Sequence, residues 1–266
     1  MTGIERIRDT FVGVREQGRA ALMPYYTVGY PTLPLSLEII TTIAHSGADL
    51  IELGVPFSDP LADGPTIQRS TQVALENGAS LAACLEIART LRDQGVTQPL
   101  ILMGYYNPIL AYGIERFGPA AAAVGVDGLI IPDLPPEEAG QLEIACQKSG
   151  LALVYLLAPT SPPERVAAIA WRTSGFIYLV SLTGVTGARQ ALPDDLGTFV
   201  ERVKNSAKTP VAVGFGISTP EQARQVGRLA DGVIVGSALI NAVDGAADPC
   251  AAVEEFVREL RAAMDQ

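Results

Sequence analysis

The sequence predicts an α/β protein, a (β/α)8 TIM barrel preceded by one extra helix at its N-terminus. Three features of the sequence indicate this fold. Eight short apolar runs recur along the 266 residues, and amphipathic stretches with a helical period separate them. The runs are continuously apolar, which is typical of parallel strands covered on both faces. A chain of this length fits one barrel of about 250 residues.

The first expected element is a helix near the N-terminus. Thr2 and Glu5 have the spacing of a capping box, in which each side chain bonds the other residue's backbone amide. The residues that follow place an apolar stripe on one helical face: Ile4, Ile7, Phe11 and Val12. This helix comes before the first apolar run, so it is additional to the eight βα units.

The eight apolar runs are the expected strands. Three of them, at Asp49, Asp127 and Asp231, begin with the same pattern of a small residue followed by an aspartate, a weak internal repeat consistent with stacked βα units. No G-x-G-x-x-G motif follows the first run, and eight units in this length favour a closed barrel over an open doubly wound sheet. The runs are Met23–Thr27, Asp49–Val55, Leu100–Met103, Gly128–Ile131, Ala152–Leu157, Gly175–Val180, Val211–Gly214 and Gly232–Gly236.

The helices between the runs have recognisable faces and start signals. Thr219 can cap one helix, with Pro220 in its first position and Gln222 in its third. Asp248 can cap the last helix. No linker or low-complexity stretch divides the chain, so residues 1–266 are expected to form a single domain.

Composition limits the classes of function. The formal net charge of -10 argues against non-specific binding to nucleic acids or anionic membranes. Three widely spaced cysteines, no signal peptide and no apolar run of about 18 residues suggest a cytoplasmic protein with free thiols. The single histidine, His45, is expected to be a partly buried helix residue, and no metal site is expected.

Carboxylates interrupt the second apolar run and the loop after it. Glu52 lies inside the run, where burial would raise its pKa and suit it to general acid/base chemistry. A structural carboxylate paired with an arginine is the alternative. Asp59 and Asp63 lie in the following loop, at the end of the barrel where catalytic side chains gather. Asp-Pro and Asp-Gly are also ordinary turn dipeptides.

Three glycine-bearing segments follow the sixth, seventh and eighth runs, and phosphate-binding loops recur in barrels after the seventh and eighth strands. Glycine allows backbone N–H groups to approach an anion, although plain tight turns would have the same composition. Tyr25, Tyr105 and Tyr178 lie near strand ends and could hold a flat ring, or could be ordinary core residues. The three segments are Ser181–Gly187, Gly214–Ser218 and Gly236–Ser237.

The stretch Leu50–Gln68 resembles the signature of the tryptophan synthase α chain family over a long, nearly unbroken match. Further segments resemble the family in the same order: Met103–Pro108, Ile131–Pro135, Gly184–Gly187 and Gly214–Ser218. The resemblance implies a lyase of tryptophan biosynthesis that cleaves indole-3-glycerol phosphate into indole and glyceraldehyde 3-phosphate. It also implies a β subunit partner that carries pyridoxal phosphate, in an α2β2 heterotetramer, and no cofactor in this chain.

The resemblance also implies roles for single residues. Glu52 and Asp63 correspond to the two catalytic carboxylates: Glu52 would move the protons, and Asp63 would bond the indole N–H. The remaining positions are Tyr178 beside the catalytic carboxylate, Tyr25 and Tyr105 around the indole, Gly187, Gly216, Gly236 and Ser237 at the phosphate, and Asp59 and Thr186 on two loops that close over the substrate.

Three other functions are compatible with parts of the pattern. A sugar-phosphate epimerase on the same barrel would commonly need metal-binding histidines, and this chain has only His45. A non-catalytic barrel that acts only as an allosteric partner would not need both Glu52 and Asp63. A stand-alone lyase that releases free indole without a partner would carry the same motifs.

Overall fold

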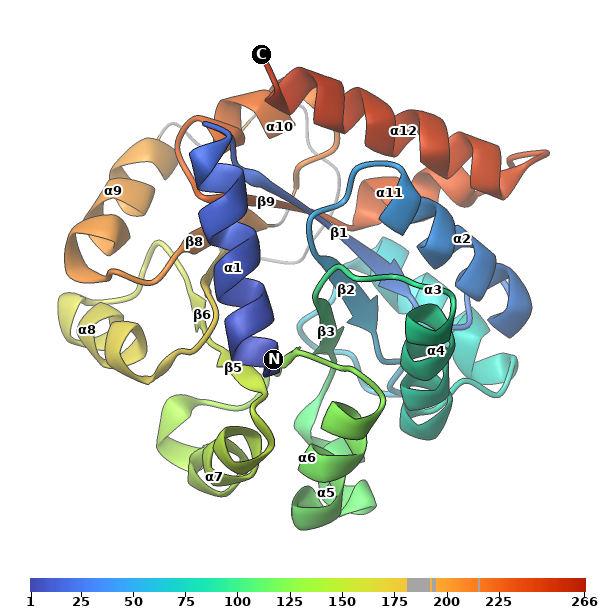
Figure 1. The fold of residues 1–266 in the computed structure, drawn as a ribbon, viewed down its shortest axis with the longest axis horizontal. Helices are drawn as coiled ribbons and strands as arrows, with labels where there is room; N and C mark the ends of the chain where they lie inside the picture. Colours follow the sequence, from blue (N-terminus) through green and yellow to red (C-terminus); the bar gives the residue numbers. More distant parts are fainter. Residues whose placement is uncertain (181–191, 193–194, 215) are drawn as a thin grey trace.

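Nine parallel strands form a nearly closed barrel in the computed structural model, which describes residues 1–180, 192, 195–214 and 216–266 (Figure 1). Neighbouring strands follow the order β5-β4-β3-β2-β1-β9-β8-β7-β6, which confirms the predicted fold class. The strands are β1 (Ala21–Thr27), β2 (Ile51–Gly54), β3 (Leu100–Met103), β4 (Gly128–Ile130), β5 (Ala152–Val154), β6 (Leu156–Leu157), β7 (Ile177–Val180), β8 (Val211–Gly214) and β9 (Gly232–Val235).

The fifth apolar run forms two short strands, where the sequence predicted one. β5 pairs with β4 and β6 pairs with β7, so this single run connects the two ends of the strand order and closes the ring. The strands separate at Tyr155, whose backbone N–H donates to the hydroxyl of Thr173 at 3.1 Å. A side chain thus takes the place of a neighbouring strand as the acceptor at that position.

Helices surround the barrel on its outer face (Figure 1). The predicted start signals are confirmed: Thr2 and Thr219 each open a helix with a complete capping box, and Asp248 accepts from the backbone N–H of Ala251. The helices in the described part of the chain are α1 (Gly3–Glu16), α2 (Leu33–His45), α3 (Pro65–Glu76), α4 (Leu81–Asp93), α5 (Tyr106–Tyr112), α6 (Ile114–Ala123), the 3-10 helix η1 (Pro136–Glu138), α7 (Gly140–Ser149), α8 (Pro163–Arg172), α9 (Leu196–Ser206), α10 (Pro220–Gly227), α11 (Ser237–Val243) and α12 (Pro249–Met264).

The extra N-terminal helix, α1, lies across the end of the barrel where the strands begin (Figure 1). The ring of Phe11 packs against Phe176, directly before β7, with 5.8 Å between ring centroids. Gly3 lies so close to the backbone of Asp127 that a Cβ would stand 2.2 Å from the carbonyl oxygen, so only glycine fits there. Because α1 covers this end, a substrate site is expected at the opposite end.

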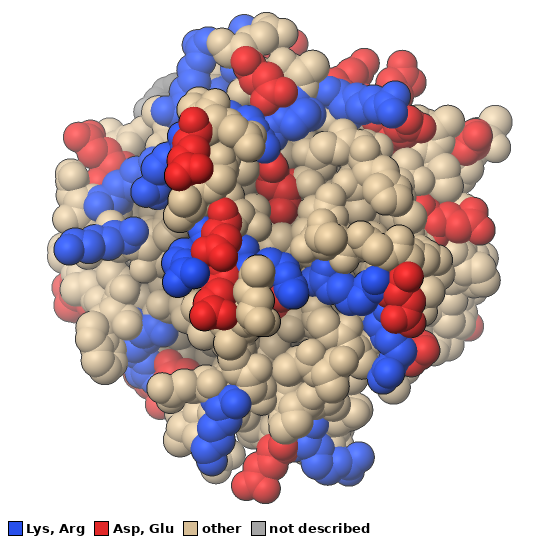
Figure 2. All heavy atoms as spheres, in the orientation of Figure 1, with Lys and Arg blue, Asp and Glu red and all other residues tan. Residues whose placement is uncertain are grey.

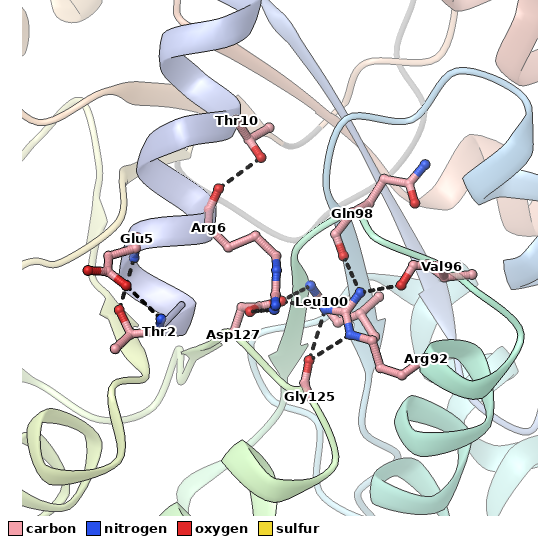
Figure 3. Close-up of polar contacts among 10 residues, drawn as sticks. All are labelled: Thr2, Glu5, Arg6, Thr10, Arg92, Val96, Gln98, Leu100, Gly125 and Asp127. Carbon is pink, nitrogen blue, oxygen red and sulfur yellow. Dashed lines mark hydrogen bonds and ion pairs between the residues drawn. The ribbon is translucent and has the colours of Figure 1, made fainter.

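Asp127 connects α1 to the barrel through a buried ion-pair cluster (Figure 3). Its side chain is 1% exposed and pairs with Arg6 of α1 and with Arg92 of α4, the latter at 2.6 Å. The same carboxylate accepts the backbone N–H of Leu100 at 2.8 Å. Arg92 is held in turn by the carbonyl oxygens of Val96, Gln98 and Gly125.

The repeated aspartate of the sequence has the same structural role in three places. Asp49 precedes β2 and accepts the N–H of Leu22 in β1, at 2.8 Å. Asp231 precedes β9 and accepts the N–H of Val211 in β8, at 2.9 Å. Asp127 does the same between β4 and β3. Each aspartate thus fixes the start of the neighbouring strand, and nearby cations balance its charge: Arg19 and Arg261 at Asp49, and Lys204 at Asp231.

Asp127→Ala is expected to lower the free energy of unfolding by about 3 kcal/mol, because it leaves partly buried arginines without their carboxylate. Chemical denaturation measures this change. Asp9→Ala is the matched control, since Asp9 pairs with Arg8 at the surface with a half-exposed side chain, and exposed pairs contribute about 1 kcal/mol or less. Equal effects of the two substitutions would contradict a special role for the buried cluster.

Charges of both signs intermingle on the face that carries α1 (Figure 2). The net charge of -10 therefore does not form a single acidic patch on this face. His45 is exposed at the end of α2, where the sequence predicted partial burial, because the helix ends at this residue. Within the described ranges, no helix is both long enough and apolar enough to cross a membrane.

Candidate functional site

A cavity opens at the end of the barrel where the strands finish. The cavity combines carboxyl and phenol groups, apolar side chains and glycines of the strand ends. Its lining residues are Tyr25, Glu52, Asp63, Ile67, Met103, Tyr178, Gly216, Ile217, Ile234, Gly236, Ser237 and Ala238.

Glu52 lies in the middle of β2 with its carboxyl group completely buried. Tyr25 of β1 and Ile101 of β3 are its neighbours across the sheet. Neither carboxyl oxygen has a hydrogen-bond partner among the described residues, which contradicts the alternative of a structural pair with an arginine. Burial raises the pKa of Glu52 to about 8, so the group is largely protonated at neutral pH.

Asp63 enters the same cavity from the loop between β2 and α3. Burial raises its pKa to about 6, and a hydrogen bond from the phenol of Tyr105 acts in the opposite direction. That bond joins the Tyr105 hydroxyl to Oδ2 of Asp63 at 3.0 Å. Between about pH 6 and pH 8, Glu52 is therefore mostly protonated while Asp63 is mostly ionised. Two carboxyl groups with separated pKa values form an acid and an anion in one site.

Tyr25 and Tyr178 line the cavity because two glycines leave room for their hydroxyl groups. A Cβ at Gly54 would stand 2.2 Å from the hydroxyl of Tyr25, and a Cβ at Gly214 would stand 2.3 Å from that of Tyr178. Burial raises the pKa of both phenols well above the usual value, so both stay protonated. The two glycines end β2 and β8, where any larger residue would displace a ring of the site.

Glycine and serine backbone forms the part of the cavity after β8 and β9. Gly216 has a φ of 85°, a conformation that favours glycine. Gly236 precedes α11 and lies so close to Tyr25 that a Cβ would come within 3.2 Å of its ring. Ser237 and Ala238 continue the lining. Close backbone approach of this kind suits an anion that is bound by main-chain N–H groups.

Tyr105 does not line the cavity and instead donates a hydrogen bond to Asp63. Asp59 is exposed on the loop after β2, where it accepts a hydrogen bond from Ser58 at 2.5 Å. Thr186 and Gly187 lie outside the described residues.

Sequence reasoning missed the apolar wall of the cavity and the support of Tyr25. The wall consists of Ile67, Met103, Ile217, Ile234 and Ala238. The Tyr25 hydroxyl lies 3.3 Å from that of Thr27, which bonds the buried hydroxyl of Ser70 at 2.8 Å. Apolar residues at strand ends resemble core residues in a sequence, so only the family-like segments that contain Ile67, Met103 and Ile217 carried a signal.

The cavity can therefore donate a proton from one wall, hold an ionised carboxylate beside it and offer backbone amides to an anion. Within the described ranges, no three or more His, Cys, Asp and Glu side chains gather in a way that could hold a metal ion.

Comparisons with known proteins identify similar chains. The family model described as "Tryptophan synthase alpha chain" matches residues 11–265. A tryptophan synthase alpha chain of Roseiflexus castenholzii is 52% identical and covers 97% of this chain and 100% of its own. That of Chloroflexus aggregans is 49% identical, with 99% of each chain covered. Among solved structures, tryptophan synthase of Mycobacterium tuberculosis matches with a TM-score of 0.92 at 40% identity, and subunit alpha of Legionella pneumophila with 0.91 at 41%; each covers 98% of both chains.

Proposed function

Since the chain belongs to the tryptophan synthase alpha chain family, we propose that the cavity between Glu52 and Gly236 is its active site. The chain is a lyase of tryptophan biosynthesis, which cleaves indole-3-glycerol phosphate into indole and glyceraldehyde 3-phosphate by a retro-aldol reaction. One observation carries the site assignment: Glu52 is fully buried in the cavity wall, and neither oxygen has a partner among the described residues.

The chemistry needs a group that delivers a proton to carbon. The bond between C3 of the indole and the side chain breaks only when the ring can accept the bonding electrons. Protonation of C3 gives an indolenine that can accept them. The side-chain hydroxyl then loses its proton as it becomes the aldehyde carbonyl, and the C–C electron pair returns to the ring. One proton enters at C3 and one proton leaves the hydroxyl, so the reaction consumes and releases no net proton.

Glu52 is the group that moves both protons. Its pKa of about 8 keeps it protonated before the reaction, as a general acid requires. After it has protonated C3, the buried carboxylate is a strong enough base to take the hydroxyl proton, because burial raises its pKa. General acid/base catalysis of this kind contributes roughly 10²–10⁴ in rate.

Asp63 is the anion that stabilises the protonated ring. Its lower pKa, about 6, leaves it ionised when Glu52 is still protonated. An ionised carboxylate accepts the indole N–H and opposes the positive charge that develops on the nitrogen. Tyr25 and Tyr178 adjoin the two carboxyl groups and stay neutral, so they can donate or accept hydrogen bonds without changing the charge of the site.

The phosphate group of the substrate lies at Gly216, Gly236 and Ser237, which line the same cavity as Glu52. Glycine at the first two positions leaves the backbone accessible, and the Ser237 hydroxyl supplies another donor. Gly187 would complete this set by resemblance to the family. The apolar wall of the cavity then covers the indole.

Gly236→Val is expected to weaken binding of phosphorylated ligands about tenfold or more, because the branched side chain would press on Tyr25 and cover the backbone N–H groups. Calorimetric titration with glycerol 3-phosphate measures this affinity. Gly140→Val is the control, since a Cβ at Gly140 meets nothing within 4 Å. An unchanged affinity in the first variant would contradict the phosphate position.

By resemblance to the family, the loop that carries Asp59 and the segment that carries Thr186, which lies outside the described residues, would close over the bound substrate. Support for closure comes from the family resemblance and from the exposure of Asp59 on the loop after β2. Closure excludes water from the indolenine and holds the reacting groups together.

The chain works with a β subunit, in an α2β2 heterotetramer whose β subunits carry pyridoxal phosphate and consume the indole. Apolar side chains beside the cavity support a docking surface there: Leu61, on the loop after β2, is 88% exposed, and Leu110 of α5 is 47% exposed. Asn107 and Pro108 lie on the same helix, α5. Residues 1–266 act in this assembly as one barrel domain.

One assay tests the function directly. Purified chain is incubated with indole-3-glycerol phosphate, with and without purified β subunit, and the indole formed is measured. We expect indole in both samples and more of it with the β subunit present. Equal rates would indicate a stand-alone lyase, and absence of indole in both samples would refute the assignment.

A further inference from the structure

Tyr105 contacts the active site from outside the cavity. The residue is 5% exposed and lies between β3 and α5, directly before the first residue of that helix. Its ring packs against Phe57 of the β2–α3 loop, with 5.2 Å between ring centroids. The ring is therefore held between this loop and the end of β3, and the cavity wall does not include it.

Two hydrogen bonds fix the direction in which the Tyr105 hydroxyl donates. The backbone N–H of Ala62 donates to the phenol oxygen at 2.9 Å. The phenol proton remains available to Oδ2 of Asp63, 3.0 Å away. A backbone amide can only donate, and a phenol has one proton, so Asp63 is the acceptor in this chain. Each bond polarises the next, and the arrangement favours an ionised Asp63.

We infer that Tyr105 is a positioning residue, whose hydroxyl holds one carboxylate oxygen of Asp63 so that the other oxygen accepts the indole N–H. This role differs from a contact between the Tyr105 ring and the substrate. It rests on the proposed function of Asp63. The hydroxyl also ties the loop backbone at Ala62, next to Asp63, to the end of β3.

The hydrogen bond also decides how much of Asp63 is ionised. Burial raises the pKa of Asp63, and the bond from Tyr105 lowers it, with about 6 as the result. Without the bond the pKa rises, so a smaller fraction of Asp63 is ionised near neutral pH. Because the reaction needs the ionised form, the acid limb of the kcat/KM profile would move to higher pH.

Tyr105→Phe tests the inference, because it removes the hydroxyl and keeps the ring that packs against Phe57. We expect kcat/KM at about pH 7 to fall about tenfold. We also expect the acid limb of the kcat/KM profile to move up by about one pH unit. If Tyr105 only stabilised the fold, the substitution would lower the melting temperature and leave the acid limb of the kcat/KM profile in place.

Tyr155→Phe is the matched control. The Tyr155 hydroxyl also donates to a carboxylate, Oε1 of Glu143 at 2.6 Å, but neither residue lines the cavity. The same atom is removed, and we expect the acid limb to stay in place.

The outcomes separate this inference from the proposed function. If Asp63→Asn is impaired but the limb in Tyr105→Phe does not move, the positioning role is wrong and the role of Asp63 stands. If Asp63→Asn retains a near-normal rate, the proposed role of Asp63 itself fails, and the inference fails with it.

Discussion

Glu52→Gln is expected to lower kcat by at least about a hundredfold and to leave substrate affinity and folding close to those of the unmodified chain. Glutamine has the shape of a protonated glutamate, but it cannot deliver a proton to C3 or take one from the hydroxyl. The buried carboxyl is already neutral over most of the physiological range, with a pKa of about 8. The substitution therefore removes proton transfer without adding or removing a buried charge.

Three measurements check this expectation: single-turnover release of indole, thermal unfolding, and calorimetric binding of the intact substrate, which the variant should bind without consuming it. Glu86→Gln is the control, because Glu86 is exposed on α4 and pairs with Arg89 at the surface. A near-normal rate in Glu52→Gln would assign the proton transfers to another group and would leave Glu52 as a structural residue.

The second large effect is expected for Asp63→Asn, with kcat/KM lower by about a hundredfold or more. The amide is nearly isosteric, but it carries no charge to oppose the positive charge on the indole nitrogen. It can also present an NH₂ group to the indole N–H, which would be unfavourable. The carboxylate charge stabilises the transition state more than it stabilises the bound substrate, so kcat should fall more than KM rises.

Steady-state kinetics with separate kcat and KM values provide the test. Asp93→Asn, at the exposed end of α4, removes a charge of the same kind far from the cavity. If Asp63→Asn changed the rate no more than Asp93→Asn does, Asp63 would be only a turn residue at the start of α3.

The sequence predicted the barrel well because its signals are local. Continuous apolar runs, capping boxes at Thr2 and Thr219 and the repeated aspartate all depend on neighbours in the chain, and each of them corresponds to a structural feature. The predicted site residues that the structure brings into one cavity lie in the strands or in the segments that follow them: Tyr25, Glu52, Asp63, Tyr178, Gly216, Gly236 and Ser237.

Other features depend on contacts between residues that are far apart in the chain. Such contacts leave no local pattern in the sequence from which they could be predicted. The hydrogen bond between Tyr105 and Asp63 spans 42 positions, so Tyr105 was interpreted as an indole contact. The division of the fifth strand depends on Thr173, which intercepts the amide of Tyr155. The cavity wall is apolar like the core, so no pattern distinguishes Ile234 from its buried neighbours.

The aspartates that fix the strand starts lie at one end of the barrel, and the carboxyl groups of the cavity lie at the other. Changes at well-separated positions usually have additive effects on stability. Residues of the apolar wall could therefore be exchanged one by one to accept substituted indoles, while the ion pairs at the strand starts keep their contribution to stability. Substitutions in the cavity wall can thus change substrate preference, and substitutions at the strand starts can change stability, each independently of the other.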